Sequence, residues 1–245
     1  MRSRQTTQQC RYFLVKNHNI RCLGLVMKVA LVTAWAIAFA YVEAAVVDYL
    51  RALYYPLAAG GFQFPLQTWD QLMAMGSEHV RRLLIEMGRE CATMVMLAAI
   101  GIIAGRNKRE AWAHFMIAFG VWDIFYYVWL KIFLDWPPSL VTWDLLFLVP
   151  VPWVAPVIAP VIISLFLIGS GLIALWLEEI DRPLSLSWLE WGFVSLGGLV
   201  VIISFCWDVE NILNGGLPQQ FQWGVFFAGL AISVITFGRH VYRRF

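Results

Sequence analysis

The chain has 245 residues, of which 60% are hydrophobic and only 14% charged, and it carries 13 tryptophans. A soluble domain is about half apolar and about a quarter charged, so this composition is typical of a polytopic membrane protein. The net charge of +2 is small, and no long basic run with interleaved aromatic residues occurs, so we expect no nucleic acid among the partners.

Long apolar stretches predict the membrane-spanning helices, since a spanning helix needs about 20 mostly apolar residues. The stretches that meet this length comprise residues 23–47, 83–105, 111–134, 156–177 and 188–207, and a sixth stretch, residues 223–237, is short but can be extended at either end. The predicted fold is therefore all-α, a polytopic bundle of six transmembrane helices. We expect a single bundle over residues 23–245, preceded by a basic cytoplasmic segment over residues 1–22 and containing a long outer loop over residues 48–82.

The stretch before the fourth predicted helix is richer in proline than a spanning helix allows. Residues 145–177 contain no charge, which is too long for one ordinary crossing, and four residues between positions 150 and 160 are proline. Proline disrupts a helix interior but is accepted in a first turn. We therefore expect the helix to start near Pro156, after an extended or re-entrant segment over residues 145–155 that protein shields from lipid.

The distribution of lysine and arginine predicts the orientation of the bundle. Most of these residues lie at the two termini and in the loops on the same side, whereas the opposite loops carry only Arg51, Arg81 and Arg82. Cytoplasmic loops are enriched in lysine and arginine, so both termini are expected in the cytoplasm. An even number of spans independently predicts that the termini lie on the same side.

Small residues one helical turn apart allow the backbones of two helices to approach closely. Such pairs occur in the second and sixth predicted helices: Gly101 with Gly105, Gly224 with Ala228, and Gly229 with Ser233. The pattern serves packing within one bundle or in a dimer equally well, and both alternatives stay open.

Charged side chains inside the predicted spans are the clearest sign of a site. A charge at the centre of a bilayer costs about 2.5–3.5 kcal/mol on insertion scales, so such residues are retained where they meet each other, water or a ligand. Glu86, Arg89 and Glu90 have the spacing i, i+3 and i+4, which places them on one face of the second helix. With the predicted topology, Glu43 of the first helix lies at a similar depth in the outer half.

A second polar stripe occurs in the third predicted helix. Asp123 lies near its middle, and Tyr126 and Tyr127 follow three and four residues later, where either phenol can donate a hydrogen bond to that carboxylate. Lys131 continues the stripe by one turn, and Asp144 follows on the outer face. The candidate ligand-binding residues are Glu43, Arg89, Tyr126, Tyr127, Lys131 and Asp144, and the candidate catalytic residues are Glu86, Glu90 and Asp123.

Three interpretations of these residues stay open. In the first, Arg89 and Lys131 neutralise nearby acids and the network is structural. In the second, the residues form a ligand site that opens outward, because carboxylates suit Mg²⁺, Ca²⁺ or Mn²⁺ and a guanidinium matches the phosphate of a lipid headgroup. In the third, the acids belong to a proton or ion pathway, although they cluster at one depth. The candidate metal ligands are Glu43, Glu86, Glu90 and Asp123.

The balance of charges within the spans favours a site over a purely structural network, since these four acids outnumber the two basic residues Arg89 and Lys131. A buried carboxylate without a basic partner takes up a proton or needs a cation. The metalloprotease, P-loop and dinucleotide-binding motifs are missing from the sequence, so whether the protein is an enzyme stays open.

Two segments resemble parts of small polytopic membrane proteins of bacteria: residues 119–127, FGVWDIFYY, and residues 142–153, TWDLLFLVPVPW. The two segments together comprise 21 of the 245 residues. It implies the bacterial inner (plasma) membrane, but it carries over no activity and no catalytic residue.

Together these patterns predict an integral membrane protein with an acid-lined polar site in the outer half of the bundle. The site is expected to bind a cation or a lipid headgroup, and catalysis there is left open. The alternative is a non-catalytic accessory subunit of a larger membrane complex, and the third interpretation is a proton or ion pathway. The expected partners are membrane lipids and, for the alternative, other membrane subunits or further copies of the chain.

Overall fold

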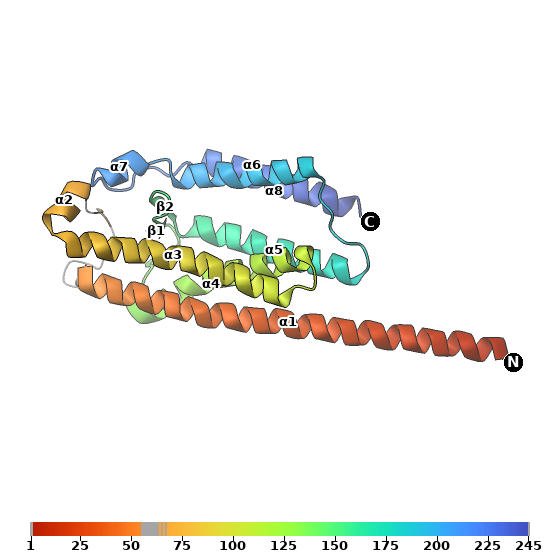
Figure 1. Cartoon of the computed structure of the whole chain (residues 1–245). Helices are drawn as coiled ribbons and strands as arrows, with labels where there is room; N and C mark the ends of the chain where they lie inside the picture. The colour runs from red at the N-terminus through yellow and green to blue at the C-terminus, as the bar shows by residue number, and fades with distance from the viewer. Residues whose placement is uncertain (1, 55–63, 65, 67, 245) are drawn as a thin grey trace.

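Helices account for most of the chain, and one short hairpin interrupts them (Figure 1). The computed structural model describes residues 2–54, 64, 66 and 68–244, and it describes side chains from residue 23 onward apart from residues 53 and 54. The remaining residues of the predicted outer loop, 55–63, 65 and 67, lie outside the described part. In chain order the elements are α1 (Arg2–Tyr54), α2 (Trp69–Ala74), α3 (Ser77–Ala104), α4 (Lys108–Leu134), β1 (Trp143–Phe147), β2 (Trp153–Pro156), α5 (Ile158–Glu179), α6 (Trp188–Phe205), α7 (Val209–Leu213) and α8 (Trp223–Tyr242).

Six of the described helices are long and apolar enough to cross a membrane: Leu23–Ala52 within α1, together with α3, α4, α5, α6 and α8. The predicted number of spans is therefore confirmed. The helices extend past the apolar stretches, because α3 begins at Ser77 and α8 ends at Tyr242. Residues 2–22 continue α1 without a break, so the predicted N-terminal segment is helical in the structure.

Polar residues beside the apolar stretches determine where several helices begin and end. The side chain of Asn107 accepts hydrogen bonds from the first backbone N–H groups of α4, and Ser187 forms a capping box with Glu190 at the start of α6. These caps satisfy donors that a helix leaves unpaired in its first turn. At the C-terminal end of α3, the Nζ atom of Lys28 donates to the carbonyl oxygen of Ala104 at 3.0 Å.

The spanning helices form two groups (Figure 1). In the four-helix group, α4 packs against α1, α3 and α5, and in the helix pair α6 packs against α8. The four-helix group has its own hydrophobic core, in which Ala36, Leu97, Ala113 and Ile117 are fully buried. A second buried core lies where α5 and β2 meet α6 and α8, and it joins the two groups.

Small residues allow the close approaches inside each group. A Cβ atom added at Gly101 would lie 2.7 Å from the carbonyl oxygen of Ala111 in α4, and one added at Gly229 would lie 2.7 Å from that of Gly197 in α6. Both positions thus serve packing within the bundle. Gly224 differs, because a Cβ atom there would meet nothing within 4 Å in the described structure. That face of α8 is open.

The proline-rich segment folds as an antiparallel hairpin of β1 and β2. Trp143 pairs with Pro156 and Leu145 with Val154, and the register shifts after Leu145. Pairing between the strands satisfies backbone groups that lipid could not satisfy. The hairpin adds a small β element to the expected all-α fold, and α5 accordingly begins at Ile158, two residues after the predicted start of the helix.

The hairpin connects the two groups of helices. Strand β2 packs against both α5 and α6, and the ring of Trp153 lies 6.3 Å from that of Phe205 in α6. We call the end of the bundle that carries α2, α7 and the hairpin the hairpin end (Figure 1). The opposite end, at which both termini lie, is the terminal end (Figure 1).

Candidate functional site

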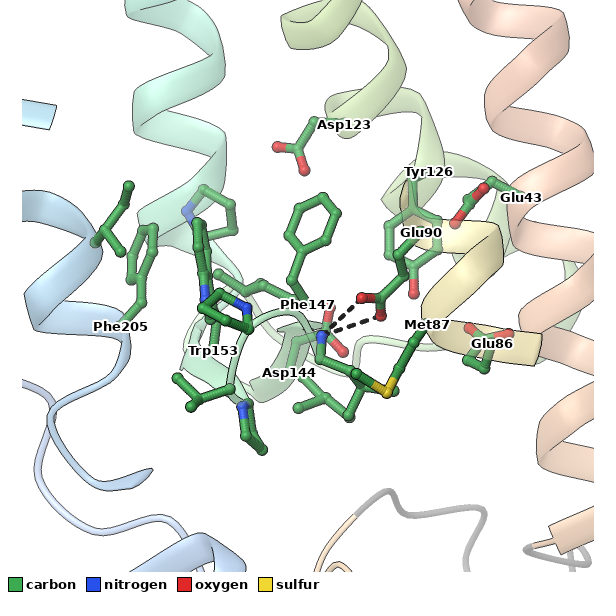
Figure 2. A pocket seen from close by; sticks show the side chains of 18 of the residues that line it. Glu43, Glu86, Met87, Glu90, Asp123, Tyr126, Asp144, Phe147, Trp153 and Phe205 are labelled. Carbon is green, nitrogen blue, oxygen red and sulfur yellow. Dashed lines mark hydrogen bonds between the residues drawn. The ribbon is translucent and has the colours of Figure 1, made fainter. Parts of the chain in front are cut away.

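A cavity of about 970 Å³ lies between the four-helix group and the helix pair, and the hairpin lines part of it. Figure 2 shows the acidic side chains of Glu43, Glu86 and Glu90 on one side of this space and the rings of Trp153 and Phe205 on the other. The charged wall of the cavity consists of its buried and half-buried charged residues, Glu43, Arg51, Glu86, Arg89, Glu90, Asp123 and Asp144, and the exposed Arg82 also lines the cavity. The apolar wall consists of Phe166, Leu167, Val194, Val201, Ile202 and Phe205.

Arg89 organises the first cluster of the charged wall. Its Nε atom lies 3.0 Å from each carboxylate oxygen of Glu86, and its Nη1 atom donates to Glu43 on the neighbouring α1. Its Nη2 atom also donates to Glu86, so all three nitrogens have carboxylate partners. Thr93, one turn along α3, donates to the second oxygen of Glu43 at 3.2 Å. The expected shared face of α3 is present, and it is already neutralised to a large extent.

Glu90 has a different role from its neighbours on the same helix face. Its two carboxylate oxygens accept the backbone N–H of Leu148 at 2.8 and 3.1 Å, the contact drawn with dashed lines in Figure 2. Leu148 follows strand β1, so this contact ties the hairpin to α3. Glu90 is 7% exposed. The structure therefore gives this candidate catalytic residue an anchoring contact.

Asp123 projects into the cavity from α4 (Figure 2). Its Oδ2 atom accepts a hydrogen bond of 2.7 Å from the hydroxyl of Ser164 in α5. Either Tyr126 or Tyr127 was expected to donate to this carboxylate, but the hydroxyl of Tyr127 donates to Asp144 instead. Tyr126 lines the cavity as expected. The correction follows from helix packing, since α5 lies against α4 and brings Ser164 to this carboxylate.

A second cluster lies nearer the hairpin end, around Asp144 of β1. The hydroxyl of Tyr127 donates to its Oδ2 atom at 2.9 Å, and the Nη2 atom of Arg51 lies 4.0 Å from its Oδ1 atom. The guanidinium of Arg51 is stacked over the ring of Trp136, with 4.0 Å between its Cζ atom and the ring centroid. Arg51 is 6% exposed and Asp144 is fully buried. This ion pair is thus inside the protein.

Lys131 does not reach the site, contrary to expectation. Its Nζ atom pairs with the carboxylate of Asp135 at 2.6 Å and also donates to the carbonyl oxygen of Pro137. Both charged side chains of this pair are largely exposed, and neither lines the cavity. The hydrogen bond from Lys131 lowers the pKa of Asp135 below its usual range. The stripe of α4 therefore turns away from the cavity within two turns of Asp123.

The acids of the charged wall do not converge as metal ligands. Among the residues that the structure describes, no group of three histidine, cysteine, aspartate or glutamate side chains could hold a metal ion. Glu43 and Glu86 share Arg89, whereas Glu90 binds the hairpin and Asp123 binds Ser164. The divalent-cation set expected from the sequence, Glu43, Glu86, Glu90 and Asp123, is consequently not gathered in one place.

Three side chains in the cavity lining keep donors without an acceptor among the described residues. The donors are the Nε and Nη2 atoms of Arg51 and the indole N–H groups of Trp122 and Trp153. Buried donors in folded proteins are almost always paired with protein or ordered water. All three of these side chains line the same cavity.

Two residues of the site were missed by sequence reasoning. Arg51 was counted only among the few basic residues of the outer loops, and Ser164 has no charge to mark it within a spanning helix. A signal for Arg51 does exist, because it lies eight residues from Glu43, which puts both on similar faces of one helix. For Ser164 no comparable signal exists in the chain alone.

The cavity is thus lined by a neutralised acidic cluster, by a stacked arginine and by the apolar wall. Comparisons with protein families, curated proteins and solved structures give no match to this chain.

Proposed function

We propose that the chain is a multi-pass protein of the bacterial inner membrane with both termini in the cytoplasm, so that the hairpin end faces outward. Six candidate spans support the multi-pass arrangement, and both termini lie at one end of the bundle (Figure 1). Basic residues concentrate at that same end, which is the distribution typical of cytoplasmic loops. The resemblance of residues 119–127 and 142–153 to bacterial membrane proteins supports the choice of membrane.

The proposed function is the binding of an amphipathic, lipid-like molecule in the cavity between the four-helix group and the helix pair. The observation that carries it is the pairing of a charged wall with an apolar wall around about 970 Å³. This volume is at the upper end of the range of small-molecule sites in proteins, about 300–1,000 Å³. A headgroup lies against the charged wall in this proposal, and the hydrocarbon part lies against Phe166, Val201 and Phe205.

The contacts of the charged wall support binding more directly than catalysis. Each candidate catalytic residue already has a structural partner: Glu86 binds Arg89, Glu90 binds the backbone of Leu148, and Asp123 binds Ser164. The side chains of Arg51, Trp122 and Trp153 keep N–H donors without an acceptor in the described part of the chain, and such donors suit recognition of an oxygen-rich headgroup. A binding role uses all of these features without requiring any acid to leave its partner.

Filling the cavity tests this function. Gly198 lines the cavity, and a Cβ atom there would meet nothing within 4 Å in the described structure, so Gly198→Trp places a large ring in the space without a backbone clash. Gly192 lies on the same helix in equally open surroundings but does not line the cavity, so Gly192→Trp is the matched control. Native mass spectrometry of protein extracted gently from its own membrane measures the bound amphiphile.

We expect wild-type protein and Gly192→Trp to carry a reproducible lipid-sized mass. Gly198→Trp should weaken binding by about tenfold, corresponding to about 1.4 kcal/mol of binding free energy, and should lower the bound fraction accordingly. Equal occupancy in all three proteins, or no bound mass in any of them, would count against the proposal.

A second candidate function is that of an accessory subunit in a larger membrane complex. The specific observation in its favour is the open face of α8, where Gly224 and Ala228 are exposed one turn apart. Small exposed residues at this spacing let another transmembrane helix approach closely. The same native spectra distinguish the two functions, since an accessory subunit leaves the membrane in assemblies of fixed composition with other chains. Gly224→Leu should disrupt those assemblies and leave lipid occupancy unchanged.

A further inference from the structure

Arg51 differs from the other arginine of the charged wall in what its donors contact. All three guanidinium nitrogens of Arg89 donate to Glu43 or Glu86. The Nε and Nη2 atoms of Arg51 have no hydrogen-bond partner among the described residues, although the residue is 6% exposed and lines the cavity. The sequence had singled out Arg89 as the residue to hold an anion, but its donors are already used.

The two unused donors of Arg51 form one geometric unit. In a guanidinium, Nε–H and one Nη–H point in the same direction along one edge, which matches two oxygens of a phosphate or a carboxylate. The ring of Trp136 covers a face of this guanidinium at 4.0 Å and so helps to fix its plane. A stacked guanidinium with a free edge is prepared to bind an oxyanion with two parallel hydrogen bonds.

Asp144 compensates the charge of Arg51 without occupying this edge. The distance from Nη2 of Arg51 to Oδ1 of Asp144 is 4.0 Å, which is too long for a hydrogen bond. The other carboxylate oxygen of Asp144 accepts from Tyr127 at 2.9 Å, which holds the carboxylate in place. The pair therefore stabilises a buried arginine electrostatically and leaves its donors available.

The position of Arg51 along the helix suits a headgroup. It lies eight residues beyond Glu43 on α1, about 12 Å nearer the hairpin end at the usual rise of a helix. Arg82 and His79 line the cavity near the same end, which makes this part of the lining more basic than the part around Glu43 and Glu86.

We propose that Arg51 is the anion-recognising residue of the cavity and binds the phosphate of a phosphate-bearing amphiphile through its Nε and Nη2 edge. The inference rests on the proposed function, since it assigns the headgroup chemistry of the same cavity. The acyl part then extends along the apolar wall, and Arg89 remains a structural residue that neutralises Glu43 and Glu86.

The experiment compares two probes that differ by one phosphate group. Full-length protein in detergent is titrated with dioctanoyl phosphatidic acid and, separately, with dioctanoylglycerol, which has the same chains without the phosphate. Binding is measured by thermophoresis for the wild type, Arg51→Gln, Arg51→Lys and Asp144→Asn. Arg81→Gln is the matched control, because Arg81 is exposed and pairs with Glu78 away from the cavity.

We expect Arg51→Gln to weaken phosphatidic acid binding by about 10- to 100-fold, the effect of losing hydrogen bonds to a charged group. Arg51→Lys should give a smaller loss, because an ammonium keeps the charge and lacks the two-donor edge. Asp144→Asn should bind phosphatidic acid at least as tightly as the wild type, since it removes a nearby negative charge. Dioctanoylglycerol should bind all five proteins equally, and Arg81→Gln should match the wild type with both probes.

Other outcomes separate the two proposals. If both probes bind equally and neither responds to Arg51→Gln, the inference about Arg51 is overturned and the cavity function stands. If neither probe binds, both proposals fail. If Asp144→Asn weakens binding as much as Arg51→Gln, Arg51 acts by maintaining the fold and the inference is overturned. Arg51→Lys keeps the test decisive should Arg51→Gln fail to fold.

Inorganic phosphate serves as a third probe for the source of the anion. Competition by millimolar phosphate that depends on Arg51, with no gain from acyl chains, would support the phosphate chemistry and assign it to a soluble ligand. Binding that requires the chains as well as the phosphate would assign it to a lipid.

Discussion

The two ends of the bundle use the same residue types in opposite surroundings. At the terminal end, Arg106 pairs with Glu110 and Arg109 pairs with Glu178, and both arginine side chains are 49% exposed. In the charged wall, Arg89 is 22% exposed and its partner Glu43 is 9% exposed. Water can solvate either terminal-end arginine if its partner is lost, although Glu110 is itself buried, whereas Arg89 and the acids around it depend on each other. The comparison teaches that burial, and not the number of ion pairs, decides which charges the fold requires.

The terminal-end pairs join neighbouring helices without enclosing a site. Arg109 connects α4 to α5 through Glu178, and His240 of α8 lies 3.1 Å from Glu190 of α6. Each group of helices is thus fastened internally at this end. At the hairpin end, by contrast, the polar contacts of Glu90 and Asp144 involve the hairpin that connects the two groups. The charges of that end therefore control the geometry of the cavity.

The largest effect is expected from Arg89→Gln. This change leaves Glu43 and Glu86 as buried carboxylates without a cation, and breaking a buried ion pair by removing one partner costs about 3–5 kcal/mol. Thermal unfolding in detergent, followed by size-exclusion chromatography, should show a large loss of folded protein. Arg81→Gln is the control at the same end, since Arg81 and Glu78 are both more than half exposed.

A compensating variant sharpens this prediction. Glu43→Gln and Glu86→Gln introduced together with Arg89→Gln remove all three charges, so most of the lost stability should return. If Arg89→Gln unfolds no more easily than Arg81→Gln, the interdependence of the wall charges is contradicted.

An intermediate effect is expected from Glu90→Gln. The amide keeps one oxygen that can accept the N–H of Leu148 but loses the charge, so the expected cost is about 1–2 kcal/mol. The readout is hydrogen–deuterium exchange over residues 143–156, which should become faster while exchange in α6 and α8 stays unchanged. Unaltered exchange in the hairpin would show that Glu90 is not its anchor.

The spans of this fold could be predicted because the length of an apolar stretch by itself determines whether a helix can cross a bilayer. The hairpin could not be predicted in this way, because the pairing of Trp143 with Pro156 depends on two strands meeting in space. Its prolines excluded a regular helix over residues 145–155 but did not select between an extended chain and a paired one. Rules that use only the local sequence thus predicted the helices, but they could not predict contacts between distant segments.

The same limit applies to the site. The pairing of Glu86 with Arg89 follows from their i, i+3 spacing and is present in the structure. The predicted hydrogen-bond donor to Asp123 was wrong. Spacing along α4 favoured a tyrosine, whereas the packing of α5 against α4 brings Ser164 to this carboxylate. The predicted place of Lys131 in the site was wrong for a related reason, since a stripe of residues along several turns of a helix rotates away from a fixed cavity. Spacing predicts neighbours on one helix, and tertiary packing decides what they face.

A small effect is expected from Arg109→Gln at the terminal end. Exposed ion pairs contribute about 0–1 kcal/mol, and salt screens them. The difference in melting temperature between this variant and the wild type should therefore be slight at low ionic strength and should vanish at about 1 M sodium chloride, where the screening length is about 3 Å. A difference that persists in high salt would indicate that Arg109 contributes through packing.

The smallest effect is expected from Lys131→Gln, which separates burial from position. Lys131 and Asp135 lie at the hairpin end, yet the Asp135 side chain is 92% exposed, so the comparison predicts behaviour like that of the terminal end. The hydrogen bond from Lys131 lowers the pKa of Asp135 in the folded protein, so its contribution to stability is present above the unfolded pKa and is lost as the pH falls through the folded value. Lys131→Gln should return this pKa toward the ordinary value of about 3.9.

Nuclear magnetic resonance titration of the Asp135 carboxyl measures this shift, and melting temperatures at pH 3 and pH 7 measure its consequence. We expect a clear change in the titration midpoint with almost no change in melting temperature at either pH. A loss of stability at pH 7 as large as that of Arg89→Gln would mean that position at the hairpin end, and not burial, makes a charge indispensable. A negligible loss would leave burial as the difference between the two ends, because the same end then contains both a dispensable pair and an essential one.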